Sequence, residues 1–250
     1  PDGLINQAAA QHSQSIEAWF MHIPGIKVVI PSNPADAKGL LKSAIRGRDP
    51  VLFLEHKGLY RQVYAKGLEG LADDLIPIGR ARIARNGTDA TIITWGALVQ
   101  KSLLAAQKLA EEGFEVEVID IRSIAPLDTS AILKSVKKTG KALIAQEDVL
   151  FLGFGAEIAA QIVERAGEQV AAREWPQFLF FTRSDPPRTG ITAWIAALMP
   201  VGHFVLVVFH ILHAFHTIAH HLLCATDIGN EAREFISFQV DGDLIEMHPI

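Results

Sequence analysis

Histidines at two places in this chain have neighbours that could support chemistry. The first is a single residue, His12, which stands in a Gln-His-Ser-Gln motif just before a stretch of helical periodicity. An imidazole titrates near neutral pH, so it can take up and release a proton during a reaction. A single histidine in front of a helix is, by itself, more often a cap or a surface residue. The motif therefore needs support from the rest of the sequence.

The second group lies in an apolar run from Ala193 to Cys224, within a stretch between Arg188 and Asp227 that has no Asp, Glu, Lys or Arg. The run is longer than the about 20 residues that span a bilayer. On a helix at about 100° per residue its six histidines would share one face. Three interpretations stay open: a shifted reading frame or faulty join, a genuine membrane-surface or interaction helix, and a metal or haem site. The histidines are His203, His210, His213, His216, His220 and His221.

The elements around His12 predict a parallel strand-helix-strand unit. Helical spacing of apolar residues runs over residues 13–23, and a β-branched run at 27–30 predicts a buried strand. Asn33 followed by Pro34 is typical of a helix start, and this helix should continue to about residue 46. A second strand is expected at 51–55. Short connections between these elements favour a parallel βαβ arrangement.

A second α/β cycle follows a stretch without periodicity, residues 57–75, which we expect to be a linker. Its strands are predicted at 88–95, 115–121 and 142–145, and its helices at 99–112, 128–138 and 153–166. We therefore expect three segments. They are a truncated first domain at residues 1–65, a second domain at residues 66–168, and an apolar, histidine-rich tail at residues 169–250.

The composition limits the classes of protein to consider. Hydrophobic residues make up 49% of the chain and the formal net charge is −5, which is typical of a globular protein. No basic stretch offers a surface for nucleic acid. The single cysteine, Cys224, excludes an internal disulfide and weakly favours a reducing compartment. No signal peptide is visible, so we expect a cytoplasmic protein, and the start at Pro1 suggests a fragment.

Several motifs occur in an order typical of one family. They are Gln11-His-Ser-Gln14, Ile23-Pro-Gly-Ile-Lys-Val-Val29, Ala35-Asp-Ala-Lys-Gly-Leu40, Val118-Ile-Asp-Ile-Arg122, Ala125-Pro-Leu-Asp128 and Gly153-Phe-Gly-Ala-Glu-Ile158. Over residues 7–166 the chain resembles the beta subunit, or the beta half of a fused chain, of thiamine-diphosphate-dependent 2-oxoacid dehydrogenases. The resemblance implies an α/β fold. A partial pyrimidine-binding domain should precede a transketolase C-terminal-like domain with a parallel or mixed sheet.

The resemblance also implies a role for His12. The matching histidine of the family faces the bound thiamine diphosphate and the incoming lipoyl group, where a sulfur of the opened dithiolane must be protonated. An imidazole suits that proton transfer. Gln11, Ser13 and Gln14 would orient the ring or contact the cofactor rather than react.

The turn at residues 43–49, at the end of the helix predicted from Pro34, resembles the loop with which the family binds a structural monovalent cation, such as K⁺. Backbone carbonyls supply most of the ligands, so changed side chains matter little. The corresponding positions are Ala44, Ile45, Gly47 and Asp49. An ordinary helix C-terminus, with its free carbonyls bound to water, explains the same residues equally well.

Asp120 and Arg122 stand two residues apart on a predicted strand, so their side chains should face the same side. Two opposite charges in that arrangement could suggest a catalytic pair. They more often form a plain ion pair, and we expect a structural role.

Two groups that the family needs for catalysis lie outside these motifs. The glutamate that activates the cofactor lies upstream of the Gln-His-Ser-Gln motif. The Gly-Asp-Gly motif for diphosphate and Mg²⁺ belongs to the alpha subunit; Asp241-Gly-Asp243 has the reverse arrangement. The resemblance therefore implies thiamine diphosphate shared with an alpha subunit or alpha half, and Mg²⁺ held through that partner. A lipoyl acyltransferase core and further beta chains are the other partners implied.

The leading hypothesis is the beta portion of the decarboxylating component of a 2-oxoacid dehydrogenase, incomplete on its own. Pyruvate is the first substrate to consider, but the sequence does not choose among pyruvate, branched-chain 2-oxoacids and acetoin. One alternative is a catalytically inactive module for assembly or cation binding. Another is a membrane-associated, histidine-rich metal-binding protein built on the apolar run.

Overall fold

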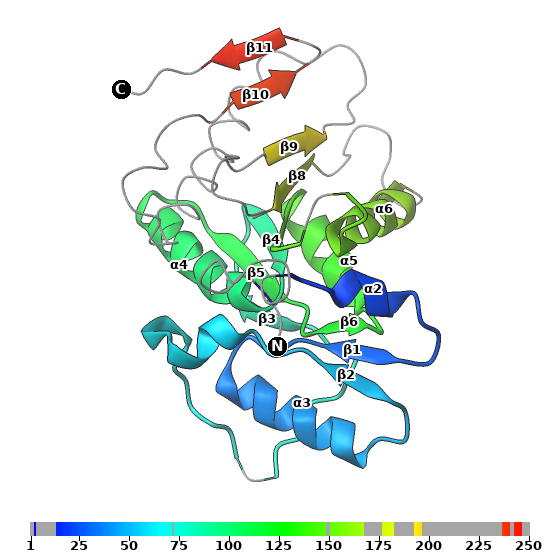
Figure 1. Ribbon diagram of the computed structural model, residues 1–250. Coiled ribbons are helices and arrows are strands. Elements are labelled where there is room, and N and C mark those ends of the chain that lie inside the picture. The colour runs from blue at the N-terminus through cyan, green and yellow to red at the C-terminus, as the bar shows by residue number, and fades with distance from the viewer. Residues whose placement is uncertain are drawn as a thin grey trace.

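The computed structural model describes Gly3, residues 14–71, 73–148 and 151–167, and the backbone of four further strands between residues 177 and 246. Two adjacent α/β units are visible in Figure 1, one built on a three-stranded sheet and one on a six-stranded sheet. The fold class expected from the sequence is confirmed.

The first unit is a short parallel βαβ arrangement. Helix α2 (Glu17–Met21) precedes strand β1 (Lys27–Val29), helix α3 (Pro34–Arg46) and strand β2 (Val51–Phe53). Strands β1 and β2 pair in parallel, as predicted. Asn33 Oδ1 accepts a hydrogen bond from the Asp36 N–H at 2.9 Å, which caps α3 where the sequence indicates.

A third strand joins this sheet from a distant part of the chain. Strand β6 (Ser123–Ala125) pairs antiparallel with β1 and gives the order β2-β1-β6. Strand β6 could not be predicted from the sequence, because three residues are too few to show a periodicity. The strand comes from the second unit, so it links the two units through backbone hydrogen bonds.

The second unit is built on a mixed sheet. Its strands, in the order β3-β5-β4-β7-β8-β9, are β3 (Arg82–Arg85), β5 (Val116–Asp120), β4 (Ala90–Thr94), β7 (Lys141–Gln146), β8 (Gln177–Thr182) and β9 (Ala193–Ala196). Strands β5, β4, β7 and β8 run parallel, and β3 and β9 are antiparallel at the two edges. This matches the predicted parallel or mixed sheet.

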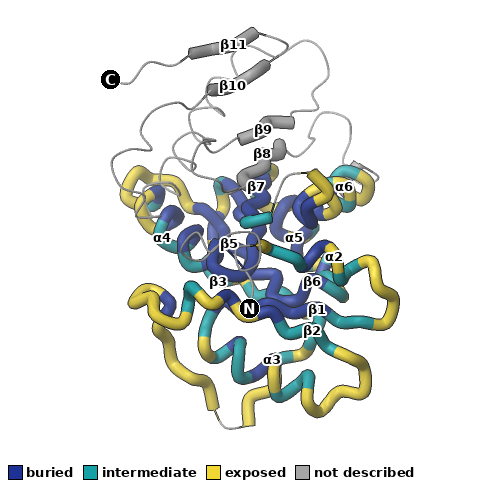
Figure 2. Tube along the Cα trace, viewed as in Figure 1, coloured by how far each residue is buried: buried dark blue, intermediate teal, exposed yellow. Residues whose placement is uncertain are grey.

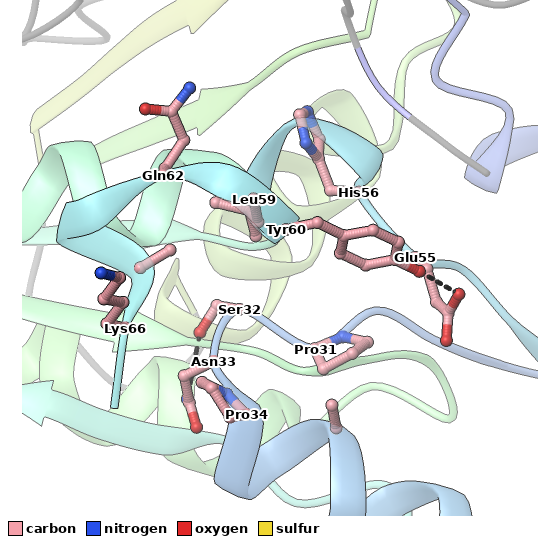
Figure 3. Close-up of a pocket in the computed structure, with 12 residues that line it drawn as sticks. Pro31, Ser32, Asn33, Pro34, Glu55, His56, Leu59, Tyr60, Gln62 and Lys66 are labelled. Carbon is pink, nitrogen blue, oxygen red and sulfur yellow. Dashed lines mark hydrogen bonds between the residues drawn. The ribbon is translucent and has the colours of Figure 1, made fainter. Parts of the chain in front are cut away.

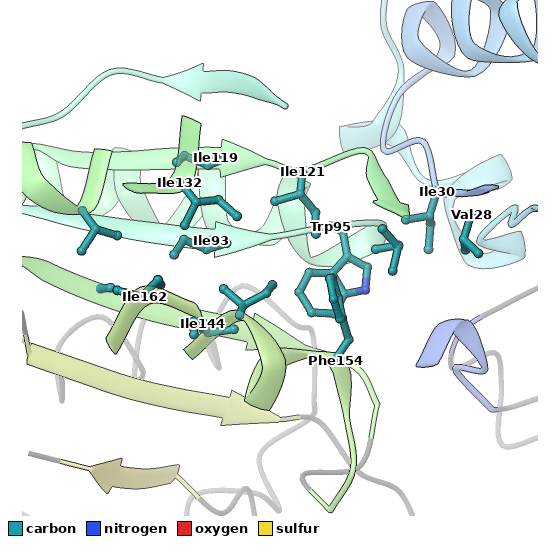
Figure 4. Close-up of a cluster of buried hydrophobic side chains, with 14 of the residues drawn as sticks. Val28, Ile30, Ile93, Trp95, Ile119, Ile121, Ile132, Ile144, Phe154 and Ile162 are labelled. Atoms are coloured by element: carbon teal, nitrogen blue, oxygen red, sulfur yellow. The ribbon is translucent and has the colours of Figure 1, made fainter. Parts of the chain in front are cut away.

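Helices cover both faces of the large sheet (Figures 1 and 2). Ile92 and its neighbour Ile93 point to opposite faces, as successive strand residues must. Ile92 packs beneath helix α4 (Ala97–Glu111), whereas Ile93 packs with helices α5 (Thr129–Thr139) and α6 (Phe154–Gly167). The second of these cores also contains Val28 and Ile30 of the first unit (Figure 4), so the two units share a hydrophobic core.

The stretch predicted to be a linker has structure of its own. It contains two 3-10 helices, η1 (Lys57–Arg61) and η2 (Val63–Ala65). Such short turns lack the repeat of 3.6 residues that identifies an α-helix in a sequence. The stretch lies against the N-terminal end of α3 and forms a wall of the pocket described below.

The segment assigned to the tail contains further strands. β8 pairs in parallel with β7 and extends the large sheet past residue 168. β9 takes up the first residues of the apolar run, so no single helix spans the run from Ala193. β10 (Ser237–Val240) and β11 (Asp243–Glu246) form an antiparallel pair. Residues 197–224, with all six histidines of the run, lie outside the described residues. Within the described ranges, no helix is both long and apolar enough to cross a membrane.

Candidate functional site

The predicted catalytic motif stands at the edge of the described part of the chain. Gln11, His12 and Ser13 lie outside the described residues, whereas Gln14 is described and exposed. The Gln14 carbonyl accepts a hydrogen bond from the Gly3 N–H at 3.1 Å. Helix α2 begins three residues later, so the structure describes the element that the motif leads into.

Helix α2 is joined to the second unit by a buried hydrogen bond. The Glu17 side chain, in a residue only 1% exposed, accepts at Oε1 from the Trp95 Nε1–H at 2.8 Å. Trp95 follows β4 and meets Phe154 edge to face, with ring centroids 5.4 Å apart. Sequence reasoning missed Glu17 because an acidic residue in a first helical turn usually reflects the helix dipole.

A second buried contact joins the two units at the ends of β2 and β7. His56 Nε2 lies 2.7 Å from Glu147 Oε2, and the two side chains are 5% and 9% exposed. Gly3 packs directly on this pair with φ +86°; a Cβ there would stand 2.0 Å from His56 Cδ2. Any other residue here would be strained by the positive φ and would require the His56 ring to shift. No local pattern of residues indicates this pair, because its members are 91 residues apart.

A pocket of about 350 Å³ opens at the carboxyl ends of β1 and β2 (Figure 3). Figure 3 shows Pro31 and Pro34 on one wall and Leu59 and Tyr60, from η1, on the other. The remaining lining residues are Ser32, Asn33, Ala37, Glu55, His56, Gln62, Ala65 and Lys66. In open α/β sheets, ligands typically bind beyond the carboxyl ends of the strands. The residues that line this pocket are therefore candidates for one wall of a ligand site.

The tyrosine of this pocket is held in its neutral form. Tyr60 Oη donates a short hydrogen bond to the Glu55 carboxylate. That bond, with smaller contributions from burial and from the negative charge of Glu55, raises the pKa of Tyr60 to about 12. Tyr60 is therefore a neutral hydrogen-bonding group near pH 7.

The expected ion pair between Asp120 and Arg122 is wrong. Asp120 accepts hydrogen bonds from Ser32 Oγ at 2.5 Å and from Arg82 at 3.0 Å. The Arg122 guanidinium instead binds Asp36 Oδ1 at 2.8 Å and the backbone carbonyl of Arg80. Strand β5 ends at Asp120 and Arg122 adopts φ +52°, so the alternation of strand side chains does not reach it.

The charged groups around Asp120 form a buried network between α3 and the large sheet. Burial raises the pKa of Asp120, in opposition to the positive charge of Arg82 and the hydrogen bond from Ser32. Arg82 also pairs with Asp36 at 3.1 Å, which connects the network to the first turn of α3. Each of these side chains forms a hydrogen bond or an ion pair with another, so the network has a structural role.

The proposed cation loop has the geometry of a helix end. The Gly47 N–H donates to the carbonyls of Ser43 at 3.0 Å and Ala44 at 3.2 Å. The Asp49 carboxylate pairs with Lys27 at 2.7 Å, and the Ile45 side chain is exposed. These contacts fit an ordinary helix C-terminus, and cation binding by this loop stays a prediction.

The residues that the structure describes suit only part of a thiamine diphosphate site. The pocket offers the apolar side chains of Pro31 and Pro34 to a ligand. Across the described ranges, no group of three or more His, Cys, Asp or Glu side chains could hold a metal ion. This part of the chain can supply a wall for the cofactor, whereas the described side chains include no cluster for its metal-bound diphosphate.

Comparisons with known proteins agree with this architecture. The transketolase pyrimidine-binding domain matches residues 1–63, and the transketolase C-terminal domain matches residues 79–178. A solved structure titled "Split gene transketolase, inactive beta4 tetramer" is similar with a TM-score of 0.56 and 20% identity. The similarity covers 86% of this chain and 60% of that one, and at this identity it supports the fold alone.

Curated relatives are more similar in sequence. The beta subunit of the pyruvate dehydrogenase E1 component of Rhizobium meliloti is 44% identical over 172 residues, 69% of this chain and 37% of that protein. The beta subunit of 2-oxoisovalerate dehydrogenase from Bacillus subtilis is 47% identical over 164 residues, which are 66% of this chain and 50% of that protein. The beta subunit of acetoin:2,6-dichlorophenolindophenol oxidoreductase from Cupriavidus necator is 46% identical over 163 residues, which are 64% of this chain and 46% of that protein.

The two domain matches and the sheet topology define a transketolase-like protein of the thiamine-diphosphate-dependent class. Within that class, the matched residues are 44–47% identical to beta subunits of a pyruvate dehydrogenase, a 2-oxoisovalerate dehydrogenase and an acetoin oxidoreductase. The chain spans between 37% and 50% of the length of the three relatives named above.

Proposed function

We propose that this chain contributes the beta portion of the decarboxylating component of a 2-oxoacid dehydrogenase, with pyruvate as the first substrate to test. The single observation that carries the proposal is the pyrimidine-binding domain match over residues 1–63. That match includes His12 and the helix α2 that follows it. The proposed assembly is cytoplasmic, and this chain is incomplete without its partners.

In this proposal His12 is the catalytic residue. Thiamine diphosphate, when bound, supplies the nucleophilic carbon and the electron sink for loss of carbon dioxide from the 2-oxoacid. The unit left after loss of carbon dioxide, still at the aldehyde oxidation level, is oxidised to an acyl group as it bonds to one sulfur of the lipoyl dithiolane. Its electron pair forms the new C–S bond, and the S–S bond breaks with its electron pair going to the other sulfur. The His12 imidazole delivers a proton to the other sulfur as that bond opens. Gln11, Ser13 and Gln14 orient the ring.

Partners complete the site. We propose that an alpha subunit, or the alpha half of a fused chain, holds Mg²⁺ and the diphosphate, and that a lipoyl acyltransferase core receives the acyl group. Contacts with further beta chains are also proposed. We keep the boundaries at residues 65 and 168 as proposals, although the C-terminal domain match continues to residue 178.

We also propose that the carbonyls of Ala44, Ile45 and Gly47, with Asp49, bind K⁺ in the assembled enzyme. Binding would require the loop to turn carbonyls outward from the end of α3. Thermal unfolding in KCl, with choline chloride at equal ionic strength as the control, tests this idea. A K⁺-specific rise in melting temperature supports it, and identical curves contradict it.

The test of the catalytic proposal replaces His12 with Ala in the chain assembled with an alpha subunit and a lipoyl domain. We expect reductive acylation of the lipoyl domain to be abolished. His22→Ala is the matched control, because His22 is an exposed histidine at the C-terminal end of α2. Normal acylation by the His12→Ala protein would overturn the catalytic assignment.

The alternative of a catalytically inactive module has its own measurement. Titration of the isolated chain with thiamine diphosphate and Mg²⁺ separates two cases. Tight binding without a partner would count against both an inactive module and a site shared with an alpha subunit. Binding only after the alpha subunit is added would support the shared site.

A further inference from the structure

The large sheet has a place where α/β proteins usually bind ligands. Strand β4 lies between β5 and β7, which are the next two parallel strands in the chain, so the strand order reverses at β4. The crevice beyond the carboxyl end of such a strand is the usual ligand site. In this protein that crevice receives side chains of the first unit.

Residues of the first unit fill the crevice closely. Gly96, directly after the Trp95 that follows β4, approaches Ile30 so nearly that a Cβ on Gly96 would stand 3.1 Å from Ile30 Cδ1. Gln100, on α4, donates from Nε2 to the Ser32 carbonyl at 3.0 Å. Figure 4 shows Trp95 and Phe154 at this end of the sheet, beside Ile30. The crevice is therefore a contact between the two units.

Glu17 is the polar residue of α2 that enters this contact. Glu17 is only 1% exposed, and its Oε1 accepts a hydrogen bond from the Trp95 indole N–H at 2.8 Å. Helix α2 has five residues, which is too short for a helix to hold itself in water. Its position must therefore come from tertiary contacts, and this buried hydrogen bond is a directional contact of its first turn with the second unit.

We propose that Glu17 and Trp95 are positioning residues for the Gln11–Gln14 motif. The second domain fixes the first turn of α2 through the Glu17–Trp95 bond and thereby sets the point from which the motif leaves the helix. This inference rests on the proposed catalytic role of His12. It gives the second domain a part in the chemistry although none of its residues needs to touch the substrate.

The variants are chosen to separate the hydrogen bond from the packing. Trp95→Phe keeps an aromatic ring against Phe154 and removes the N–H. Glu17→Leu removes the acceptor, whereas Glu17→Gln keeps an acceptor oxygen of the same reach. Trp19→Phe is the control on the same helix, because Trp19 is 69% exposed.

The first readout compares two half-reactions of the assembled enzyme. Decarboxylation is followed with 2,6-dichlorophenolindophenol as electron acceptor, and acyl transfer is followed with a lipoyl domain. A small displacement of a catalytic group costs roughly 100-fold in rate. We expect Trp95→Phe and Glu17→Leu to lose about that factor in acyl transfer while dye reduction changes little. Glu17→Gln and Trp19→Phe should retain both activities.

The second readout needs no activity. Amide hydrogen exchange over residues 14–21 of the isolated chain should accelerate in Trp95→Phe and Glu17→Leu, and stay unchanged in Glu17→Gln. Unchanged exchange in Trp95→Phe would overturn the positioning role, whether or not the chain assembles into an active enzyme. An equal loss of both half-reactions would show a general structural defect and would also overturn it.

The two proposals fail in different ways. If His12→Ala retains acyl transfer, the catalytic assignment fails. If His12→Ala loses acyl transfer but Trp95→Phe retains it, the catalytic assignment stands and the positioning role fails.

Discussion

His56 Nε2 lies 2.7 Å from Glu147 Oε2, and this contact joins the segment after β2 to the residue after β7. Both side chains are almost completely buried. The contact lies at the same junction between the units as the Glu17–Trp95 bond, since β4 and β7 are neighbours in the sheet. The two domains are therefore held together by specific polar contacts in addition to their shared apolar core.

A double-mutant cycle should show that the His56–Glu147 contact stabilises the fold. We expect His56→Phe and Glu147→Leu each to lower the free energy of unfolding by about 1–3 kcal/mol, because each leaves a buried polar partner with one bond fewer. The double variant should lose less than the sum, with a coupling of about 0.5–3 kcal/mol. Urea unfolding of the four proteins measures this. Additive losses would mean that the two side chains do not interact.

Gly3→Ala should displace residue 3 from the His56–Glu147 pair. A Cβ at Gly3 would stand 2.0 Å from His56 Cδ2, which no small adjustment relieves. Gly25→Ala is a matched control, because Gly25 has the same φ of +86° but open space around it. The left-handed conformation costs both alanines about 1–2 kcal/mol. Hydrogen exchange at the amides after Gln14 should accelerate in Gly3→Ala alone; equal behaviour of the two variants would refute the close packing.

Features with a local cause could be predicted from the sequence, and features that depend on distant partners could not. Asn33 marks the start of α3, since a cap acts within four residues. The short strand β6 and the contact between Glu17 and Trp95, 78 residues apart, exist only because the units meet. His12 was found through a resemblance to a family, and it stays a prediction because it lies outside the described residues.

Asp128 should stabilise the protein more at neutral pH than in acid. It caps α5, and its carboxylate accepts hydrogen bonds from Ser130 Oγ and from the Ala81 and Ala131 N–H groups. Burial acts to raise the pKa of Asp128, but these bonds outweigh it and lower the pKa below 3.8. The stabilisation is therefore present above the unfolded pKa and is lost as the pH falls through the folded value.

The Asp128→Ala variant tests this dependence. It should cost about 1–2 kcal/mol at pH 7, the usual value of a lost cap, and the difference from the parent should shrink on acidification towards pH 3. Asp128→Asn is the control, because it retains a cap acceptor but cannot titrate. Unfolding by urea at a series of pH values gives the free energies. A constant cost at all pH values would contradict the lowered pKa.

Asp120 should show the opposite dependence on pH, although it is a carboxylate of the same protein. Burial raises its pKa above the unfolded value of 3.8, and this outweighs the charge of Arg82 and the Ser32 hydroxyl. A raised pKa means that the folded state holds the proton more tightly than the unfolded chain. Its contribution to stability is therefore complete below pH 3.8 and declines as the pH rises through the folded pKa.

Asp120→Asn cannot undergo this change, and its amide oxygen can still accept from Arg82 and Ser32. The variant should thus gain stability relative to the parent as the pH is raised from 3 towards neutrality, as measured by urea unfolding at matched ionic strength. A growing loss over the same interval would show that the charge of Arg82 dominates over burial and that the pKa of Asp120 is lowered.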